Sequence, residues 1–174
     1  KGNAEPEFTR KYIGIPDPNP IFESLIEIRD KTKIHVEITD LVVPQVGDSL
    51  VHAKKLAKFV YDNFGPEMPI HFLRFHPDYK MNDIPSTPIA TLEKHYQVAK
   101  MQGLQYVYLG NVPGHKYENT YCPGCNSVVV GRFGYDITSW NLTPDNKCRA
   151  CCHKIPINGQ LDKNYRKNRF QFVI

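Results

Sequence analysis

Residues 121–151 read YCPGCNSVVVGRFGYDITSWNLTPDNKCRAC and contain two Cys-x-x-Cys pairs separated by 22 residues. The pairs are Cys122 with Cys125 and Cys148 with Cys151. Two thiolates three residues apart on a tight turn fill two corners of a tetrahedron, so two such pairs complete a closed four-thiolate site. The spacing predicts one structural metal ion held by these four cysteines. Zinc is favoured, and iron in a rubredoxin-like site is the alternative because it also accepts four thiolates.

The residues between the two pairs have the pattern of a β-hairpin. Val128–Val130 is an apolar run, residues 131–134 (Gly-Arg-Phe-Gly) are predicted to form the turn, and residues 135–137 the returning strand. Two Cys-x-x-Cys knuckles joined by a hairpin are typical of a zinc ribbon. A change of register that puts Cys152 or His153 in place of Cys151 stays open. The matching spacing of the two pairs favours Cys151, with Cys152 as a packed spare thiol.

The composition of the chain changes near residues 111–114. Of the 174 residues, the first 117 contain 14 basic and 14 acidic side chains, so the net charge of +4 lies in residues 118–174, together with all five cysteines. We therefore predict two domains, residues 1–117 and residues 118–174, the second being the ribbon with a basic tail. Paired cysteines in odd total number favour metal binding in a reducing compartment, with the cytoplasm as the default. No apolar run approaches the ~20 residues that span a membrane.

The first domain alternates between predicted helices and strands. The predicted helices begin with capping or proline signals and run over 19–32, 49–64 and 87–103. The predicted strands are apolar or alternating runs and cover 34–43, 70–75 and 106–109. This alternation indicates α/β architecture with right-handed crossovers and a parallel sheet.

Three strands are too few to close a barrel. We therefore expect half of a barrel or of an open sheet, with the other strands in sequence outside this chain, an expectation that also fits Lys1 in place of a starting methionine. The strands are apolar enough to be covered on both faces. Functional groups of such sheets gather in the loops after the carboxyl ends of the strands, here Pro44–Ser49, His76–Pro88 and Gly110–His115.

Two histidines and an aspartate are candidate site residues in these segments. His76 follows a predicted strand and precedes a proline, at the edge where ligand contacts concentrate. His71, inside the same strand, is interpreted as a hydrogen-bonded core histidine. Asp48 is interpreted as a helix-capping acid, with a ligand contact as the alternative. The sequence contains no nucleophile elbow, phosphate loop or His-Glu-x-x-His pattern, so this chain alone has no complete active site.

Three segments together resemble a known family. They are Val36-Glu-Ile-Thr-Asp-Leu-Val-Val-Pro44 with Asp48-Ser49, Pro69-Ile-His-Phe-Leu-Arg-Phe-His76-Pro-Asp-Tyr-Lys-Met81, and Tyr106-Val-Tyr-Leu-Gly-Asn-Val112 followed by the two knuckles. In this order they are similar to the C-terminal half of the radical SAM proteins of the AmmeMemoRadiSam system, relatives of the pyruvate formate-lyase activating enzymes. The opening Lys1-Gly2 and Phe8-Thr-Arg-Lys-Tyr12 resemble the stretch after a central barrel strand.

The resemblance implies that this chain is the C-terminal part of a partial (β/α) TIM-like barrel followed by a small zinc ribbon. It also implies an enzyme whose first half binds a 4Fe-4S iron-sulfur cluster through a Cys-x3-Cys-x2-Cys loop and S-adenosyl-L-methionine on that cluster. Reductive cleavage then yields a 5′-deoxyadenosyl radical. This chain departs from the pattern because its cysteines all lie at or after position 122. We therefore expect S-adenosylmethionine and the cluster only with the missing N-terminal half, which is the expected partner, and no activity of this chain alone. By resemblance, His76 contacts the adenosine moiety, Lys1 lies near the methionine carboxylate, and Asp48 lies beside the site.

A second hypothesis is a non-enzymatic zinc-ribbon module that binds nucleic acid or protein. Its support is the basic tail, where cations alternate with aromatic residues over 154–172. We favour a solvated face with a terminal strand for this tail, because the charge is small for a nucleic-acid binder. The predicted partners therefore exclude a membrane and disfavour nucleic acid, while the substrate stays open, a protein being one candidate.

Overall fold

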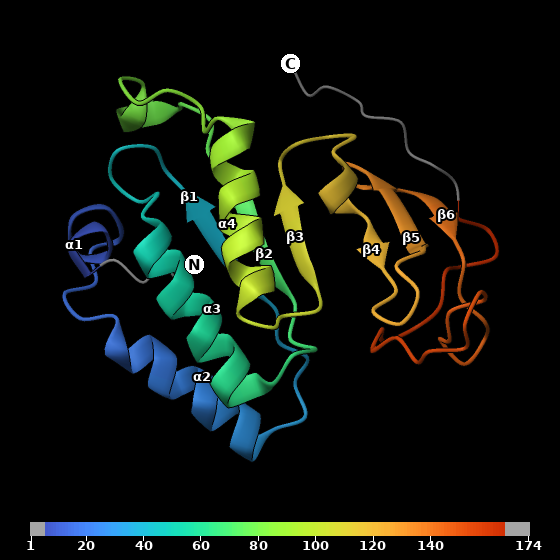
Figure 1. Ribbon diagram of the computed structural model, residues 1–174. Helices are drawn as coiled ribbons and strands as arrows, with labels where there is room; N and C mark the ends of the chain where they lie inside the picture. Colours follow the sequence, from blue (N-terminus) through green and yellow to red (C-terminus); the bar gives the residue numbers. More distant parts are fainter. Residues whose placement is uncertain (1–5, 166–174) are drawn as a thin grey trace. The chain divides into compact units, whose positions relative to one another are not determined.

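The structure, a computed structural model, describes residues 6–165 and separates into two compact units, Lys1–Asn111 and Val112–Ile174 (Figure 1). We call them the α/β unit and the ribbon unit. The boundary falls inside the segment 111–114 where the composition changes, a few residues before the predicted one. Lys1 and residues 166–174 of the basic tail lie outside the described residues.

The α/β unit alternates helices with strands. Its elements in chain order are α1 (Pro6–Phe8), the π-helical turn η1 (Thr9–Ile13), α2 (Asn19–Lys31), β1 (Ile38–Val42), α3 (Leu50–Phe64), β2 (Ile70–Arg74), the short 3-10 helix η2 (Tyr79–Met81), α4 (Ile89–Met101) and β3 (Val107–Gly110). The strands form one parallel sheet in the order β1-β2-β3, so each connection is a helical crossover. The predicted α/β class and parallel sheet are confirmed. The sheet has three strands and is not a barrel.

Helices α3 and α4 cover one face of this sheet (Figure 1). That face buries Ile70 and Phe72 of β2 completely, and the ring of Phe72 meets the ring of His95 from α4 edge-on at 5.4 Å. The buried stripe of α4 runs through Leu92, His95 and Ala99, at helical spacing. Ile89, at the start of the helix, lies outside this stripe and is 44% exposed.

The other face of the sheet is only half covered by the described residues. At the carboxyl end, Phe8, Val43 and Phe75 form a small buried cluster with partly buried neighbours from η1 and from the loop after β2. At the amino end, alternate side chains of β2 and β3, such as His71 and Tyr108, stay half exposed. A parallel sheet with one open face departs from the usual two-sided burial.

The start of one predicted helix agrees with the structure, and the start of one predicted strand does not. Helix α2 begins at Asn19, as predicted, with Pro18 as the N-cap residue, and the Asp17 carboxylate accepts the Asn19 N–H at 3.0 Å. Strand β1 begins at Ile38 and not at Ile34, which is 65% exposed. The Ile38 N–H bonds the carbonyl of Pro69, and proline has no N–H with which to continue the ladder toward Ile34.

Helix α3 follows its sequence signals closely. Ser49 is the N-cap, its hydroxyl accepting the His52 N–H at 3.5 Å, and Gly65 ends the helix with φ of 83°. The predicted capping role of Asp48 is therefore wrong: the next residue caps the helix, and Asp48 lies half-buried before it.

Thr87 ties the loop after β2 to the sheet. Its buried hydroxyl donates to the carbonyl of Val42 at 2.6 Å and accepts the Phe75 N–H at 2.9 Å. The loop that carries His76 is thus fastened to the carboxyl ends of β1 and β2.

The ribbon unit contains an antiparallel sheet of order β4-β5-β6, with β4 (Thr120–Tyr121), β5 (Val128–Phe133) and β6 (Asp136–Trp140), after a short 3-10 helix η3 (Lys116–Glu118). The hairpin is confirmed but its turn is Gly134-Tyr135, not residues 131–134. Gly131 is a buried strand residue, and a Cβ there would stand 2.4 Å from Ser139 Oγ. The glycine therefore serves close cross-strand packing beside a register shift.

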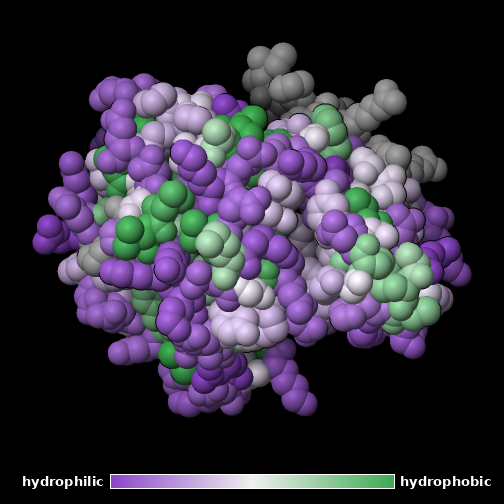
Figure 2. Space-filling view, viewed as in Figure 1, coloured by the Kyte–Doolittle hydropathy of each residue, from purple (hydrophilic) through white to green (hydrophobic). Residues whose placement is uncertain are grey.

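The described surface is polar. Hydrophilic residues predominate on the face drawn in Figure 2, and the hydrophobic ones form small separate groups. None of the described helices has the length and apolar character needed to cross a bilayer.

Candidate metal centre

Four cysteine sulfurs converge in the ribbon unit. Those of Cys122, Cys125, Cys148 and Cys151 all lie within 4.8 Å of one another. Cys122 Sγ is 3.4 Å from Cys151 Sγ, and Cys125 Sγ is 3.7 Å from Cys148 Sγ. A tetrahedral ion with metal–sulfur bonds of ~2.3 Å holds its ligands ~3.8 Å apart. The spacing fits one metal ion, and the predicted quartet is the group that could hold it.

The first knuckle is shaped by its own backbone. The Asn126 N–H donates to the Cys122 carbonyl at 2.8 Å, and the Cys122 N–H donates to the Ser127 carbonyl at 2.9 Å. Asn126 has φ of 58°, a left-handed conformation that asparagine tolerates better than most residues. The sequence-based prediction did not include this role of Asn126, although an asparagine directly after a Cys-x-x-Cys pair indicates such a turn.

The second knuckle repeats the same two hydrogen bonds. The Cys152 N–H donates to the Cys148 carbonyl at 2.8 Å, and the Cys148 N–H donates to the His153 carbonyl at 2.8 Å. Cys152, with φ of 64°, occupies the left-handed position that Asn126 has in the first knuckle. The correspondence explains why Cys152 is outside the quartet and Cys151 inside it. Cys152 is exposed and not packed, which corrects the expectation for the spare thiol.

Gly124 lies where the two knuckles meet. A Cβ at this position would stand 3.4 Å from Cys151 Sγ and 3.3 Å from the Cβ of His153. The glycine of the Cys-Pro-Gly-Cys sequence therefore allows the second knuckle to approach the first.

The two exposed cysteines of the quartet have pKa values shifted in opposite directions. Cys122 and Cys148 are buried, while Cys125 and Cys151 are exposed. The Ser127 hydroxyl lowers the pKa of Cys125 to about 6. The backbone of His153 acts to lower the pKa of Cys151, but the neighbouring cysteine sulfurs together raise it to about 12. Without a metal Cys151 therefore keeps its proton at neutral pH, and a divalent ion that displaces this proton would bind more weakly as the pH falls.

The candidate residues outside the ribbon lie at one edge of the parallel sheet. Asp48 is in the loop after β1 and His76 in the loop after β2, and these strands are neighbours. His76 is exposed, and its Nδ1–H donates to the Pro77 carbonyl at 2.8 Å, which leaves Nε2 as the acceptor atom of the ring. Lys1 lies outside the described residues.

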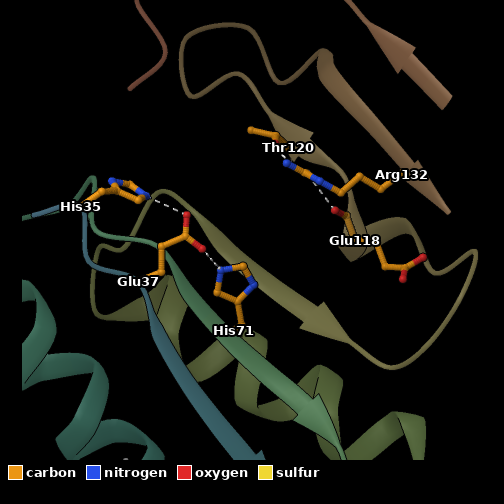
Figure 3. Close-up of polar contacts among 6 residues, drawn as sticks. All are labelled: His35, Glu37, His71, Glu118, Thr120 and Arg132. Atoms are coloured by element: carbon orange, nitrogen blue, oxygen red, sulfur yellow. Dashed lines mark hydrogen bonds and ion pairs between the residues drawn. The ribbon is translucent and has the colours of Figure 1, made fainter. Parts of the chain in front are cut away.

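His71 belongs to a polar cluster that the sequence did not reveal. Its Nε2 lies 2.8 Å from Glu37 Oε2, and His35 Nε2 lies 2.9 Å from Glu37 Oε1, so two imidazoles flank one carboxylate (Figure 3). The ring of His71 also stacks on Tyr108, with centroids 4.8 Å apart and an angle of 21°. His71 is hydrogen-bonded, as interpreted, but it is half exposed and not a core residue.

The Glu37 carboxylate should make the α/β unit less stable in acid. The hydrogen bond from His71, aided by His35, lowers the Glu37 pKa from 4.5 to about 2 against the opposing effect of burial. Because the folded pKa is the lower one, this contribution to stability is present above pH ~4.5 and is lost as the pH falls toward ~2. Urea unfolding between these limits should show a flatter acid dependence in Glu37→Gln. The control Glu67→Gln, at an exposed loop position, should follow the wild type; an unchanged slope in Glu37→Gln would contradict the assignment.

A second polar cluster anchors the ribbon hairpin. The Arg132 guanidinium donates to the Glu118 carbonyl at 3.1 Å and to Thr120 Oγ1 at 2.7 Å (Figure 3). The Glu118 carboxylate accepts the Gly114 N–H at 2.6 Å, and burial raises the Glu118 pKa. These contacts hold η3 and β4 against β5.

No family model matches the chain. An uncharacterized protein of Methanocaldococcus jannaschii is 43% identical over 158 residues, which are 90% of this chain and 46% of that protein. The chain thus spans about half the length of the curated relative it matches.

Proposed function

We propose that the chain is the C-terminal part of a radical S-adenosylmethionine enzyme of the AmmeMemoRadiSam type, related to pyruvate formate-lyase activating enzyme and acting in the cytoplasm. The observation that carries the proposal is the β1-α3-β2-α4-β3 unit, whose parallel sheet has helices on one face and a partly open second face. In the proposal, further βα units of a preceding half pair with the β1 edge of this sheet, and its partly open face lies toward the barrel interior. The relative, about twice as long as the matched region, has room for such a half.

The cysteines of this chain fit the ribbon metal and do not fit a radical SAM cluster. All five lie at or after position 122, and four of them form the quartet. In the proposal the cluster ligands therefore belong to the N-terminal half, which is the partner. Four sulfurs in a closed set favour zinc as the ribbon metal. When bound, S-adenosylmethionine and the cluster supply the hydrogen-abstracting radical.

The edge with His76 and Asp48 is the part of this chain that faces the cofactor in the proposal. Loops after the carboxyl ends of parallel strands are where α/β proteins bind ligands. His76 has its Nδ1 engaged with Pro77, so Nε2 can accept a hydrogen bond from an adenosine amino group. Thr87 fixes the loop that carries it.

The alternative, a ribbon that binds nucleic acid, draws less support from the described residues. Arg132 donates to backbone and side chain within the ribbon, Arg149 donates to the Leu142 carbonyl at 3.0 Å, and Lys147 pairs with Asp145 at 2.8 Å. These cations already have internal partners. The aromatic positions 170 and 172 of the tail lie outside the described residues.

Anaerobic reconstitution compares the full-length protein with this 174-residue chain. With iron and sulfide, the full-length protein should gain about four irons and, with a reductant, convert S-adenosylmethionine to methionine and 5′-deoxyadenosine. The chain alone should do neither. In the full-length protein, His76→Ala should raise the Kd for S-adenosylmethionine roughly tenfold, the loss of about one hydrogen bond. A full-length protein without cluster or cleavage, or a chain alone that assembles four irons, would contradict the proposal.

A further inference from the structure

The cluster of His35, Glu37 and His71 has the composition of a metal site. Two imidazole nitrogens and one carboxylate are the ligand set of many catalytic zinc and non-haem iron sites. Here both Nε2 atoms already face the two oxygens of one carboxylate, at 2.9 and 2.8 Å (Figure 3). The side chain of His35 is 49% exposed, that of Glu37 44% and that of His71 26%. A small ion can therefore reach them from solvent.

The backbone explains why these three residues meet. His35 and Glu37 are two apart in the extended segment before β1, so their side chains leave the chain on the same side. His71 pairs in register with Thr39, two residues beyond Glu37, and is therefore its diagonal neighbour on the adjacent strand. Tyr108, in register with His71 on β3, stacks on the imidazole and restrains its ring.

We propose that His35, Glu37 and His71 bind a divalent transition-metal ion such as Co²⁺ or Zn²⁺ in a second metal site, separate from the ribbon quartet. Without metal, the carboxylate lies between the imidazoles and accepts their Nε2–H groups. On binding, each Nε2 offers a lone pair to the ion: a neutral ring carries its proton on Nδ1 instead, and a doubly protonated ring releases its Nε2 proton to solvent. The side chains then close on the ion, which takes the place of the Nε2 protons. The site keeps positions open for water or another ligand, because the protein supplies three ligands.

This site is also distinct from the edge assigned to S-adenosylmethionine. His71 is the second residue of β2, whereas His76 follows its carboxyl end. Five extended residues span ~16 Å at ~3.3 Å each. The inference therefore goes beyond the proposed function and does not depend on it.

Cobalt titration of protein whose ribbon is loaded with zinc tests the proposal. Co²⁺ binds N, O and S ligands more weakly than Zn²⁺, so it should leave the ribbon zinc in place. We expect one additional Co²⁺ per chain, with visible d–d bands and no thiolate charge-transfer absorption. Glu37→Gln and His71→Asn should each weaken this binding at least ~10-fold, since even residues that only support metal ligands cost 10- to 100-fold.

Glu67→Gln, at an exposed loop position, is the matched control for Glu37→Gln and should bind Co²⁺ like the wild type. Circular dichroism of each variant confirms that it is folded. The proposal is overturned if no Co²⁺ binds beyond exchange at the ribbon, or if folded Glu37→Gln and His71→Asn both retain the second ion at wild-type affinity.

Discussion

Replacing Cys148 by serine should abolish metal binding and unfold the ribbon unit while the α/β unit stays folded. Cys148 is buried and supplies one of four sulfurs. Metal binding to such sites contributes ~10–16 kcal/mol in small zinc domains, and this free energy becomes folding free energy because the unfolded chain has no preformed site. Among residues 112–165, few large side chains are buried and could compensate. Chelation of the wild-type metal should have the same effect.

Trp140 makes this result measurable, because it is the single tryptophan of the chain and lies in β6 of the ribbon. Its fluorescence reports the ribbon, whereas helical circular dichroism reports α2, α3 and α4 of the other unit. Cys148→Ser should show tryptophan emission of an unfolded environment with most of the helical signal retained. Cys152→Ser, at the exposed position outside the quartet, should keep one metal per chain and wild-type emission. Native emission in metal-free Cys148→Ser would show that the ribbon folds without its metal.

Phe72→Ala should destabilise the α/β unit by ~3–5 kcal/mol, the range for a buried aromatic residue. Phe72 is fully buried between the sheet and α4, where its ring contacts His95. Urea unfolding followed by helical circular dichroism should show the loss. Met101→Ala, at a position 80% exposed on α4, should stay within ~0.5 kcal/mol of the wild type. A loss below ~1 kcal/mol in Phe72→Ala would mean that this face is not the core.

The sequence predicts those parts of the molecule that depend on local signals. Helix α3 has a serine cap, a regular apolar stripe and a terminal glycine, and its predicted and observed bounds agree. The quartet is likewise predicted, because two Cys-x-x-Cys pairs specify their own turns. The start of β1 is not predicted, because it depends on Pro69, which directly precedes strand β2 and lies 31 positions beyond Ile38.

The cluster of His35, Glu37 and His71 could not be predicted from the sequence for the same reason. Glu37 and His71 are 34 residues apart and become neighbours through the register of β1 with β2. The position of Gly131 shows the converse error: a local glycine signal was interpreted as a turn, whereas cross-strand crowding by Ser139 requires it. Packing between distant segments decides such positions.

X-ray absorption at the metal edge of the purified protein tests the central claim most directly. One tightly bound zinc per chain is expected, with four sulfur neighbours at ~2.3 Å and no nitrogen neighbour. Cys152→Ser should leave this spectrum unchanged, because Cys152 lies outside the quartet. A mixed sulfur and nitrogen shell would mean that His153 has replaced a thiolate, and the absence of a tightly bound metal would contradict the metal centre as a whole.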